Sequence, residues 1–189
     1  MASKFLLLLG PSGTGKSTVI RELRKLDGRF VYISPYITRK LREGEADKIP
    51  LSEARMDEMD SRGEFLVIND LYGIRYATPL TPIIEAFDSG SFPLLDWPIS
   101  RMDVMTQAFP DRLFVIYLIP PSEEVLRIRL GQDERDPTGS RLRAALQELA
   151  DFQNGAYDHL FDLSVIAHDN QVSQIAQSIY SPYLKAIRG

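Results

Sequence analysis

The feature that most restricts how this chain can fold is the segment GPSGTGKST, Gly10–Thr18. It satisfies the pattern G-x-x-x-x-G-K-[ST], and it lies between an apolar run, Phe5–Leu9, and an amphipathic stretch, Lys16–Leu26. Such a loop needs a strand before it and a helix after it, because its glycines let backbone amides wrap an anion at the helix N-terminus. A glycine-rich turn with a surface lysine is the alternative, but it does not require this order of elements. The segment therefore predicts a phosphate loop.

Each residue of the loop has an expected contact with a nucleoside triphosphate. Backbone amides face the β-phosphate, the Lys16 side chain bridges the β- and γ-phosphates, and the Ser17 hydroxyl binds Mg²⁺. A phosphate loop alone does not distinguish a kinase from an ATPase or a GTPase. The predicted nucleotide-binding residues are Gly13, Thr14, Gly15, Lys16, Ser17 and Thr18.

Five short apolar runs have the continuous character of strands buried on both faces. Helical patterns lie between them, such as Lys16–Leu26 and Ser122–Leu130, and strands that alternate with helices form parallel sheets. We predict an α/β fold, a P-loop kinase core with a five-stranded parallel sheet flanked by helices. The expected strands are Phe5–Leu9, Phe30–Ile33, Phe92–Asp96, Leu113–Ile119 and Leu163–Ala167.

The region 34–91 breaks this alternation and predicts an inserted lobe. It contains an arginine-bearing polar loop, a short helix and two strand-like pieces. Thr81 is expected to cap a further helix, with Pro82 at its first position. The expected elements of the lobe are a helix over Ser52–Arg62 and strands near Phe65–Ile68 and Tyr72–Ala77.

A second break, GQDERDPTGS at 131–140, is charged and rich in turn residues between two helices, and it predicts a lid. No internal repeat or linker is present. We therefore expect one domain over 1–189, with a core at 1–33 and 92–189, the inserted lobe at 34–91 and the lid at 131–140.

Composition excludes several classes of protein. The net charge of −4 and the pI near 5.3 argue against a general nucleic-acid or membrane-surface binder, which normally carries a basic excess. The absence of cysteine excludes disulfides and thiolate chemistry and fits a reducing cytoplasm. The apolar runs are too short for a signal region or a bilayer span. We expect a soluble, cytoplasmic protein, either a monomer or a homodimer.

Two arginines lie three positions apart in the loop after the second expected strand. Bidentate contacts to a phosphate suit Arg39 and Arg42, whereas an isolated R-x-x-R is more often solvated charge. The phosphate loop upstream favours the first interpretation, because an enzyme that phosphorylates a phosphate must hold several anionic groups together.

Over nearly its whole length the chain resembles the guanylate kinase family. GPSGTGKST is similar to that family's phosphate loop, TRKLREGE to T-R-x-P-R-x-G-E, RGEFL to R-G-E-F-L, and YATPL to Y-G-T-P-L. Further similarities are LLD to L-L-D-I-D, PPSEEVLRIRL to a P-P-S strand-to-helix junction, and RLRAALQEL to R-L-x-x-A-x-x-E-L. The resemblance implies a phosphate-loop core with an acceptor-binding lobe and a lid.

The resemblance implies roles for six residues on the acceptor and transfer side. Asp96 is expected to orient Mg²⁺-bound water or the acceptor, and the alternative is that it caps a helix. For the two arginines assigned to the lid, the alternatives are a solvated charge for Arg135 and a position on the helix surface for Arg141. The implied acceptor-phosphate ligands are Arg39, Arg42 and Tyr76, and the implied lid arginines that neutralise the transferred group are Arg135 and Arg141.

The departures from the family pattern fall where the family recognises guanine. Pro35, Val67 and Pro98 stand at positions of a serine, a glutamate and an aspartate, while Thr78 keeps a hydroxyl near the base and Asn69 can face the same way as Val67. The segment after residues 44–45 is also shortened and lacks a tyrosine. In YITR and the shortened loop the chain resembles the ribose 1,5-bisphosphate phosphokinases.

Other conspicuous residues have simpler interpretations. His159 and His168 are expected at the surface or in satisfied core positions, and Met56 and Met59 in packing. Trp97 suits either base stacking or core packing.

The sequence thus predicts a phosphotransferase that uses ATP and Mg²⁺ and moves the γ-phosphate onto the phosphate of a small acceptor, a nucleoside monophosphate with GMP first. The alternatives are a ribose 1,5-bisphosphate phosphokinase, a guanylate-kinase-like module that binds phosphorylated peptides, and a stand-alone nucleotide switch. The intact phosphate loop argues against the binding module, and the additional arginines argue against the switch.

Overall fold

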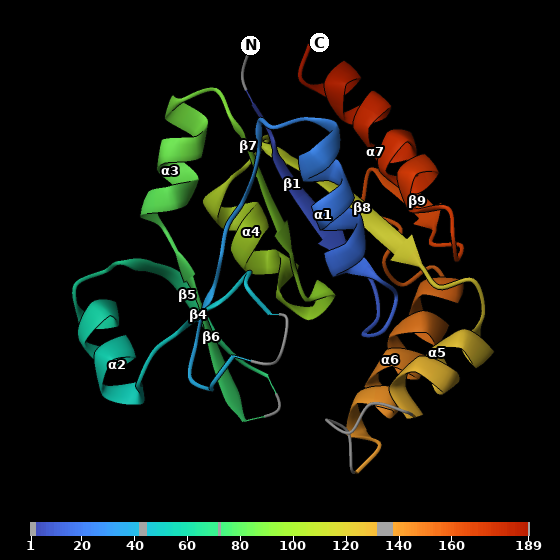
Figure 1. Cartoon of the computed structure of the whole chain (residues 1–189), viewed down its shortest axis with the longest axis horizontal. Coiled ribbons are helices and arrows are strands. Elements are labelled where there is room, and N and C mark those ends of the chain that lie inside the picture. Colours follow the sequence, from blue (N-terminus) through green and yellow to red (C-terminus); the bar gives the residue numbers. More distant parts are fainter. Residues whose placement is uncertain (1–2, 42–44, 72, 132–137, 189) are drawn as a thin grey trace.

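A five-stranded parallel sheet forms the centre of the molecule (Figure 1). The computed structural model describes residues 3–41, 45–71, 73–131 and 138–188. The three central strands are mostly buried, as expected for apolar runs covered on both faces, whereas the two edge strands alternate in exposure. The predicted sheet is confirmed, in the order β2 (Phe30–Tyr32), β7 (Phe92–Asp96), β1 (Phe5–Leu9), β8 (Leu113–Ile119), β9 (Leu163–Ile166).

Helices cover both faces of this sheet. The chain moves from β1 to β2 in one direction and from β7 to β8 in the other, so right-handed crossovers put α1 (Lys16–Leu26) and α4 (Met102–Ala108) on opposite faces. The last helix, α7 (Val172–Ala186), lies beside α1 (Figure 1). A 3-10 turn, Ile99–Arg101, leads into α4. None of the helices in the described ranges is long and apolar enough to cross a bilayer.

A second, four-stranded sheet lies between β2 and β7 in the chain. Its order is β4 (Ile49–Pro50), β3 (Tyr36–Ile37), β6 (Ile74–Pro79), β5 (Phe65–Leu71). β5 and β6 form an antiparallel ribbon with a bulge between Phe65 and Val67. The bulge lets Phe65 pack on one side of the ribbon while Leu66 and Val67, although consecutive, both pack against the main core.

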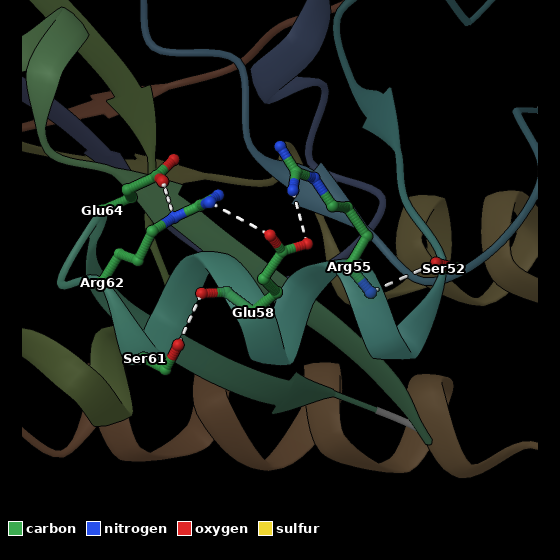
Figure 2. A network of polar contacts seen from close by, with 6 residues as sticks. All are labelled: Ser52, Arg55, Glu58, Ser61, Arg62 and Glu64. Atoms are coloured by element: carbon green, nitrogen blue, oxygen red, sulfur yellow. Dashed lines mark hydrogen bonds and ion pairs between the residues drawn. The ribbon is translucent and has the colours of Figure 1, made fainter.

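The helix of this second unit is α2 (Glu53–Ser61). Ser52 caps it by accepting a hydrogen bond from the Arg55 amide at 3.2 Å, and Glu58 pairs with Arg55 and Arg62 along the exposed face (Figure 2). The inner face carries Met56 and Met59, which pack against the ribbon. The predicted packing role of the two methionines is confirmed.

Two further helices, α5 (Glu123–Gly131) and α6 (Ser140–Gln153), pack on each other through a small apolar cluster. They flank the segment expected to form the lid. Of that segment, residues 132–137 lie outside the described residues, and with them the expected lid arginine Arg135.

Several boundaries differ from the sequence prediction; β6, for example, covers Ile74–Pro79 instead of Tyr72–Ala77. The helix α3 (Thr81–Asp88) begins one residue early, because Leu80 is already in the right-handed helical region and its carbonyl accepts from the Ile83 amide. The prediction that Thr81 is the cap is therefore wrong, and Pro82 is the second helical residue. β5 extends to Leu71, where the Asp70 carboxylate accepts from the Gly73 amide in the turn.

Candidate active site

The phosphate loop joins β1 to α1 in a conformation that depends on glycine. Gly10 has φ of +125°, and a Cβ there would lie 2.4 Å from the carbonyl oxygen of Leu118 on β8. Gly13 has φ of +83°, and a Cβ there would lie 3.2 Å from the Leu130 side chain. The loop is therefore pressed against both the sheet and α5, and only glycine fits at these points without displacement.

Lys16 lies inside the loop at the start of α1. Its ammonium donates to the carbonyl oxygens of Gly10 at 2.5 Å and Pro11 at 3.0 Å. Burial lowers the pKa of Lys16, while the carboxylates of Asp96 and Glu148 oppose that shift. The Lys16 side chain thus pairs with loop carbonyls and lines the same cavity as the rest of the loop from Ser12 onward.

Two arginines from the helices that flank the lid segment contact the loop. Arg141 of α6 donates to the Ser12 hydroxyl at 2.6 Å, and Arg129 of α5 donates to the Gly13 carbonyl at 2.8 Å and pairs with Asp169. Arg141, expected from the family resemblance as a lid arginine, therefore contacts the phosphate loop. Arg129 was missed, because its position in an amphipathic helix gives no sign of this contact.

On the acceptor side, Arg39 forms a bidentate ion pair with Glu45, with nitrogen–oxygen distances of 2.7 and 2.8 Å. The hydrogen bonds to Glu45, with a smaller contribution from Tyr76, raise the pKa of Arg39 against the effect of burial. Its Nε is buried without a hydrogen-bond partner within the described parts of the chain. Arg42 lies outside the described residues.

Lys48 is a second cation that sequence reasoning missed. Its side chain is 15% exposed and lies 3.7 Å from Glu45 and 3.6 Å from Asp47. It lines the cavity that Arg39 and Tyr76 also line. Lys48 belongs to the shortened loop, where the family pattern has a tyrosine. A basic residue in that loop was therefore the sequence feature that could have identified it.

Asp96 ends β7 near the phosphate loop and accepts a hydrogen bond of 2.7 Å from the Tyr32 hydroxyl. Burial and this carboxylate raise the pKa of Tyr32. The residue that caps the following 3-10 turn is Pro98, so the alternative of Asp96 as a helix cap is wrong. Asp96 shares a cavity with Ser17, whose hydroxyl is exposed on the first turn of α1.

Glu148 of α6 is another missed residue. Its carboxylate accepts a hydrogen bond of 3.4 Å from the Tyr117 hydroxyl, and burial raises its pKa against the attraction of Lys16. An acid within a helical RLRAALQEL segment gives no local sign that it faces the phosphate loop.

The residues described above surround two adjoining cavities. The larger has a volume of about 1010 Å³ and is lined by Ser12–Thr18 of the loop together with Arg39, Tyr76, Asp96 and Arg141. His168 and Asp169, which follow β9, also line it, whereas His159 is exposed and does not.

The smaller cavity has a volume of about 350 Å³ and lies over the β5–β6 ribbon. Pro35 and Pro98 line it, but Val67 does not, because Val67 packs against the main core. The predicted core packing of Trp97 is confirmed, since the residue is 3% exposed and belongs to the main core, and Trp97 also forms a wall of this cavity. Its indole nitrogen donates to the Arg101 carbonyl at 2.8 Å.

Comparison with known proteins agrees with this geometry. The guanylate kinase family model matches residues 2–181. A guanylate kinase from Carboxydothermus hydrogenoformans is 30% identical over 183 residues, covering 92% of this chain and 88% of the relative. One from Lactobacillus acidophilus is 34% identical over 181 residues, covering 90% and 87%.

Among solved structures, guanylate kinase from Anaplasma phagocytophilum superimposes with a TM-score of 0.75 at 20% identity, covering 97% of this chain and 86% of that one. Shikimate kinase from Acinetobacter baumannii gives 0.53 at 18% identity, covering 97% and 94%. At these identities the likeness concerns the fold alone. The extent of the family match and of the curated relatives shows that this chain belongs to the guanylate kinase family of P-loop nucleotide kinases.

Proposed function

We propose that this protein transfers the γ-phosphoryl group of ATP to the phosphate of a nucleoside monophosphate, with GMP as the first acceptor to test. One observation carries the proposal. The phosphate loop and the basic residues Arg39 and Lys48, which lie between β3 and β4, line a single cavity of about 1010 Å³, so a donor and an acceptor phosphate can lie side by side within it. The curated relatives named guanylate kinase support the choice of acceptor.

On the donor side, loop amides bind the β-phosphate and Lys16 moves from the Gly10 and Pro11 carbonyls to the β- and γ-phosphate oxygens. Arg141 donates a hydrogen bond to Ser12 of the loop and neutralises charge that develops on the transferred group. Arg135 is proposed to act with it. The proposed donor ligands are Gly13, Thr14, Gly15, Lys16, Ser17 and Thr18.

On the acceptor side, Arg39, Arg42 and Tyr76 hold the phosphate, and Thr78 lies near the base. Arg39 is already arranged for bidentate contact, since its two terminal nitrogens bind the two oxygens of Glu45. Acceptor binding on this view exchanges one anionic partner for another, with the buried Nε available for a further phosphate oxygen.

Mg²⁺ fits the residues of this site. Magnesium in phosphate-loop enzymes is held largely by a hydroxyl, phosphate oxygens and water, with few carboxylates. Ser17 and Asp96 supply one hydroxyl and one carboxylate to the same cavity, and no cluster of three or more His, Cys, Asp or Glu side chains arranged to hold a metal occurs in the described part of the chain. When bound, the ion screens the phosphate charges. We also propose a cytoplasmic location, which a chain without cysteine fits.

The test is ADP release with ATP, Mg²⁺ and a panel of nucleoside monophosphates. Ribose 1,5-bisphosphate belongs in the panel, because the prolines at 35 and 98 offer no side-chain hydrogen bond to a base. Turnover stimulated by GMP supports the proposal. Turnover with ribose 1,5-bisphosphate and with none of the nucleoside monophosphates would show that the acceptor is a sugar phosphate instead. Absence of acceptor-stimulated turnover, with ATP binding intact by calorimetry, contradicts the kinase activity and favours the binding module.

A further inference from the structure

The smaller cavity contains a buried amide that has no partner in the protein. Asn69 on β5 is 5% exposed, and its Oδ1 makes no hydrogen bond to any residue in the described ranges. A buried acceptor without a partner destabilises a folded protein, because the water it loses is not replaced. Its presence in a cavity wall is explained if a ligand supplies the missing donor.

The strand register directs Asn69 into this cavity. On the ribbon, Val67 pairs with Thr78, Asn69 with Tyr76 and Leu71 with Ile74, so these six side chains share one face. Five of them, all except Val67, line the smaller cavity. The expectation that Asn69 faces the same way as Val67 is confirmed.

Tyr76 connects Asn69 to the acceptor phosphate position. It lies directly opposite Asn69 in the ribbon and lines both cavities. The other residues common to both cavities are polar and lie around the phosphate loop: Ser12, Lys16, Lys48, Asp96 and Arg141. A molecule whose phosphate lies at Tyr76 therefore extends its remaining part toward Asn69.

The walls that belong to the smaller cavity alone are mainly apolar. They include Leu71, Ile74, Leu95 and Trp97, and the polar side chains on the ribbon face are Asn69 and Thr78. Glu148 also lines this cavity, but it faces Lys16 and Tyr117. Apolar walls with hydrogen-bonding groups on one side suit a flat heterocycle with a polar edge better than a sugar, whose hydroxyls point in all directions.

We infer that Asn69 recognises the base of the acceptor through an adjacent donor and acceptor on its edge. This rests on the proposed kinase function. A carboxamide offers one acceptor and one donor group, whereas a carboxylate only accepts. The N1–H and C6=O of a 6-oxopurine match the amide, and both are present in guanine and hypoxanthine. The 2-amino group of guanine is not needed for this contact, so GMP and IMP are comparable acceptors.

The first experiment uses the wild-type protein. The ratio of kcat/KM for GMP to that for IMP is expected to be below about tenfold, since a neutral hydrogen bond to the 2-amino group contributes no more than this. A larger ratio overturns the inference, because it requires a strong partner for the 2-amino group.

The second experiment varies the side chain. Asn69→Ala is expected to raise the acceptor KM about tenfold and to leave the ATP KM unchanged, with a thermal midpoint equal to or above that of wild type. A purely structural asparagine would instead lower the midpoint. Asn69→Asp introduces an acceptor-only group that pairs with both N–H groups of guanine, so the GMP-to-IMP ratio rises. The matched control is Asp70→Asn on the opposite ribbon face, which keeps the hydrogen bond to Gly73.

A binding readout separates this inference from the proposed function. Trp97 is the only tryptophan in the sequence and lines the cavity, so its fluorescence reports GMP and IMP binding without ATP. Binding that Asn69→Ala weakens, in a protein without turnover, contradicts the kinase proposal but supports Asn69 as the base ligand. Unchanged binding and unchanged acceptor KM in Asn69→Ala overturn the role of Asn69, whatever the turnover.

Discussion

At the scale of single residues, Lys16 is the most exacting test of the donor site. Its partly buried ammonium is held by loop carbonyls, which phosphate oxygens replace in the proposed complex. We predict that Lys16→Ala lowers kcat by roughly 10²–10³-fold, the usual loss when one preorganised electrostatic contact is removed. ADP release measures this. Lys25→Ala, in the exposed last turn of the same helix, is the control and should retain wild-type turnover.

Arg39 is the corresponding residue for the acceptor. Because its guanidinium is proposed to bind the acceptor phosphate through charged hydrogen bonds, Arg39→Ala should raise the acceptor KM by about 10–100-fold and change the ATP KM little. Steady-state kinetics with each substrate varied in turn would reveal the difference.

The control for Arg39 is Arg55→Ala. Arg55 also pairs with a glutamate, Glu58, but on the exposed face of α2 away from both cavities (Figure 2). Wild-type constants in Arg39→Ala, or equal effects of the two substitutions, would contradict phosphate binding by Arg39.

At the scale of elements, the phosphate loop depends on its close approach to β8. Gly10→Ala combines a φ of +125° with a Cβ 2.4 Å from the Leu118 carbonyl oxygen, so the loop or the strand must shift. We predict a loss of about 2–4 kcal/mol in the free energy of unfolding, measured by urea denaturation.

Gly28→Ala serves as the control for the loop. A Cβ at Gly28 would meet no atom within 4 Å, and the backbone there has no left-handed φ. The substitution should therefore change the unfolding free energy by about 0.5 kcal/mol or less. Equal destabilisation by the two alanines would show that glycine is not required at position 10.

At the scale of the whole molecule, Asp27 connects the first and last helices. Its carboxylate accepts from Arg29 and, at 2.7 Å, from the Tyr180 hydroxyl of α7. The hydrogen bonds, chiefly with Arg29, lower the pKa of Asp27 from 3.8 to about 2. A carboxyl with a lowered pKa in the folded state stabilises that state above its unfolded pKa, and the contribution disappears as the pH falls toward about 2.

We therefore predict that Asp27→Asn lowers the unfolding free energy by roughly 1 kcal/mol at neutral pH, a figure reduced for solvent screening. The difference from wild type should stay constant above about pH 4 and shrink as the pH falls toward about 2. Asp60→Asn, at the exposed end of α2, is the control. A difference that does not vary with pH would mean that Asp27 acts through packing alone.

Much of this architecture follows from local patterns in the sequence. The five strands of the main sheet are continuous apolar runs, and the phosphate loop fixes the first strand and helix, so both could be predicted. The partners of the site residues could not. These partners depend on which loops and helices meet in space, and a charged residue in a polar segment gives no sign of which residue it will contact. Examples are the contacts of Arg39 with Glu45 and of Arg129 with Gly13, and the position of Glu148 beside Lys16. The start of α3 was missed because Leu80, an apolar residue, is the cap.

The bulge in β5 has a consequence for how the substrate preference of such a protein can change over evolutionary time. In a strand that alternated without interruption from Phe65, the side chains turned toward the smaller cavity would be Ile68 and Asp70 instead of Asn69. A shift of the strand by one residue thus replaces the neutral amide in the cavity wall by one hydrocarbon side chain and one carboxylate. A lineage could therefore acquire a different acceptor preference through a single-codon insertion or deletion in this strand, with every residue proposed to bind ATP left intact.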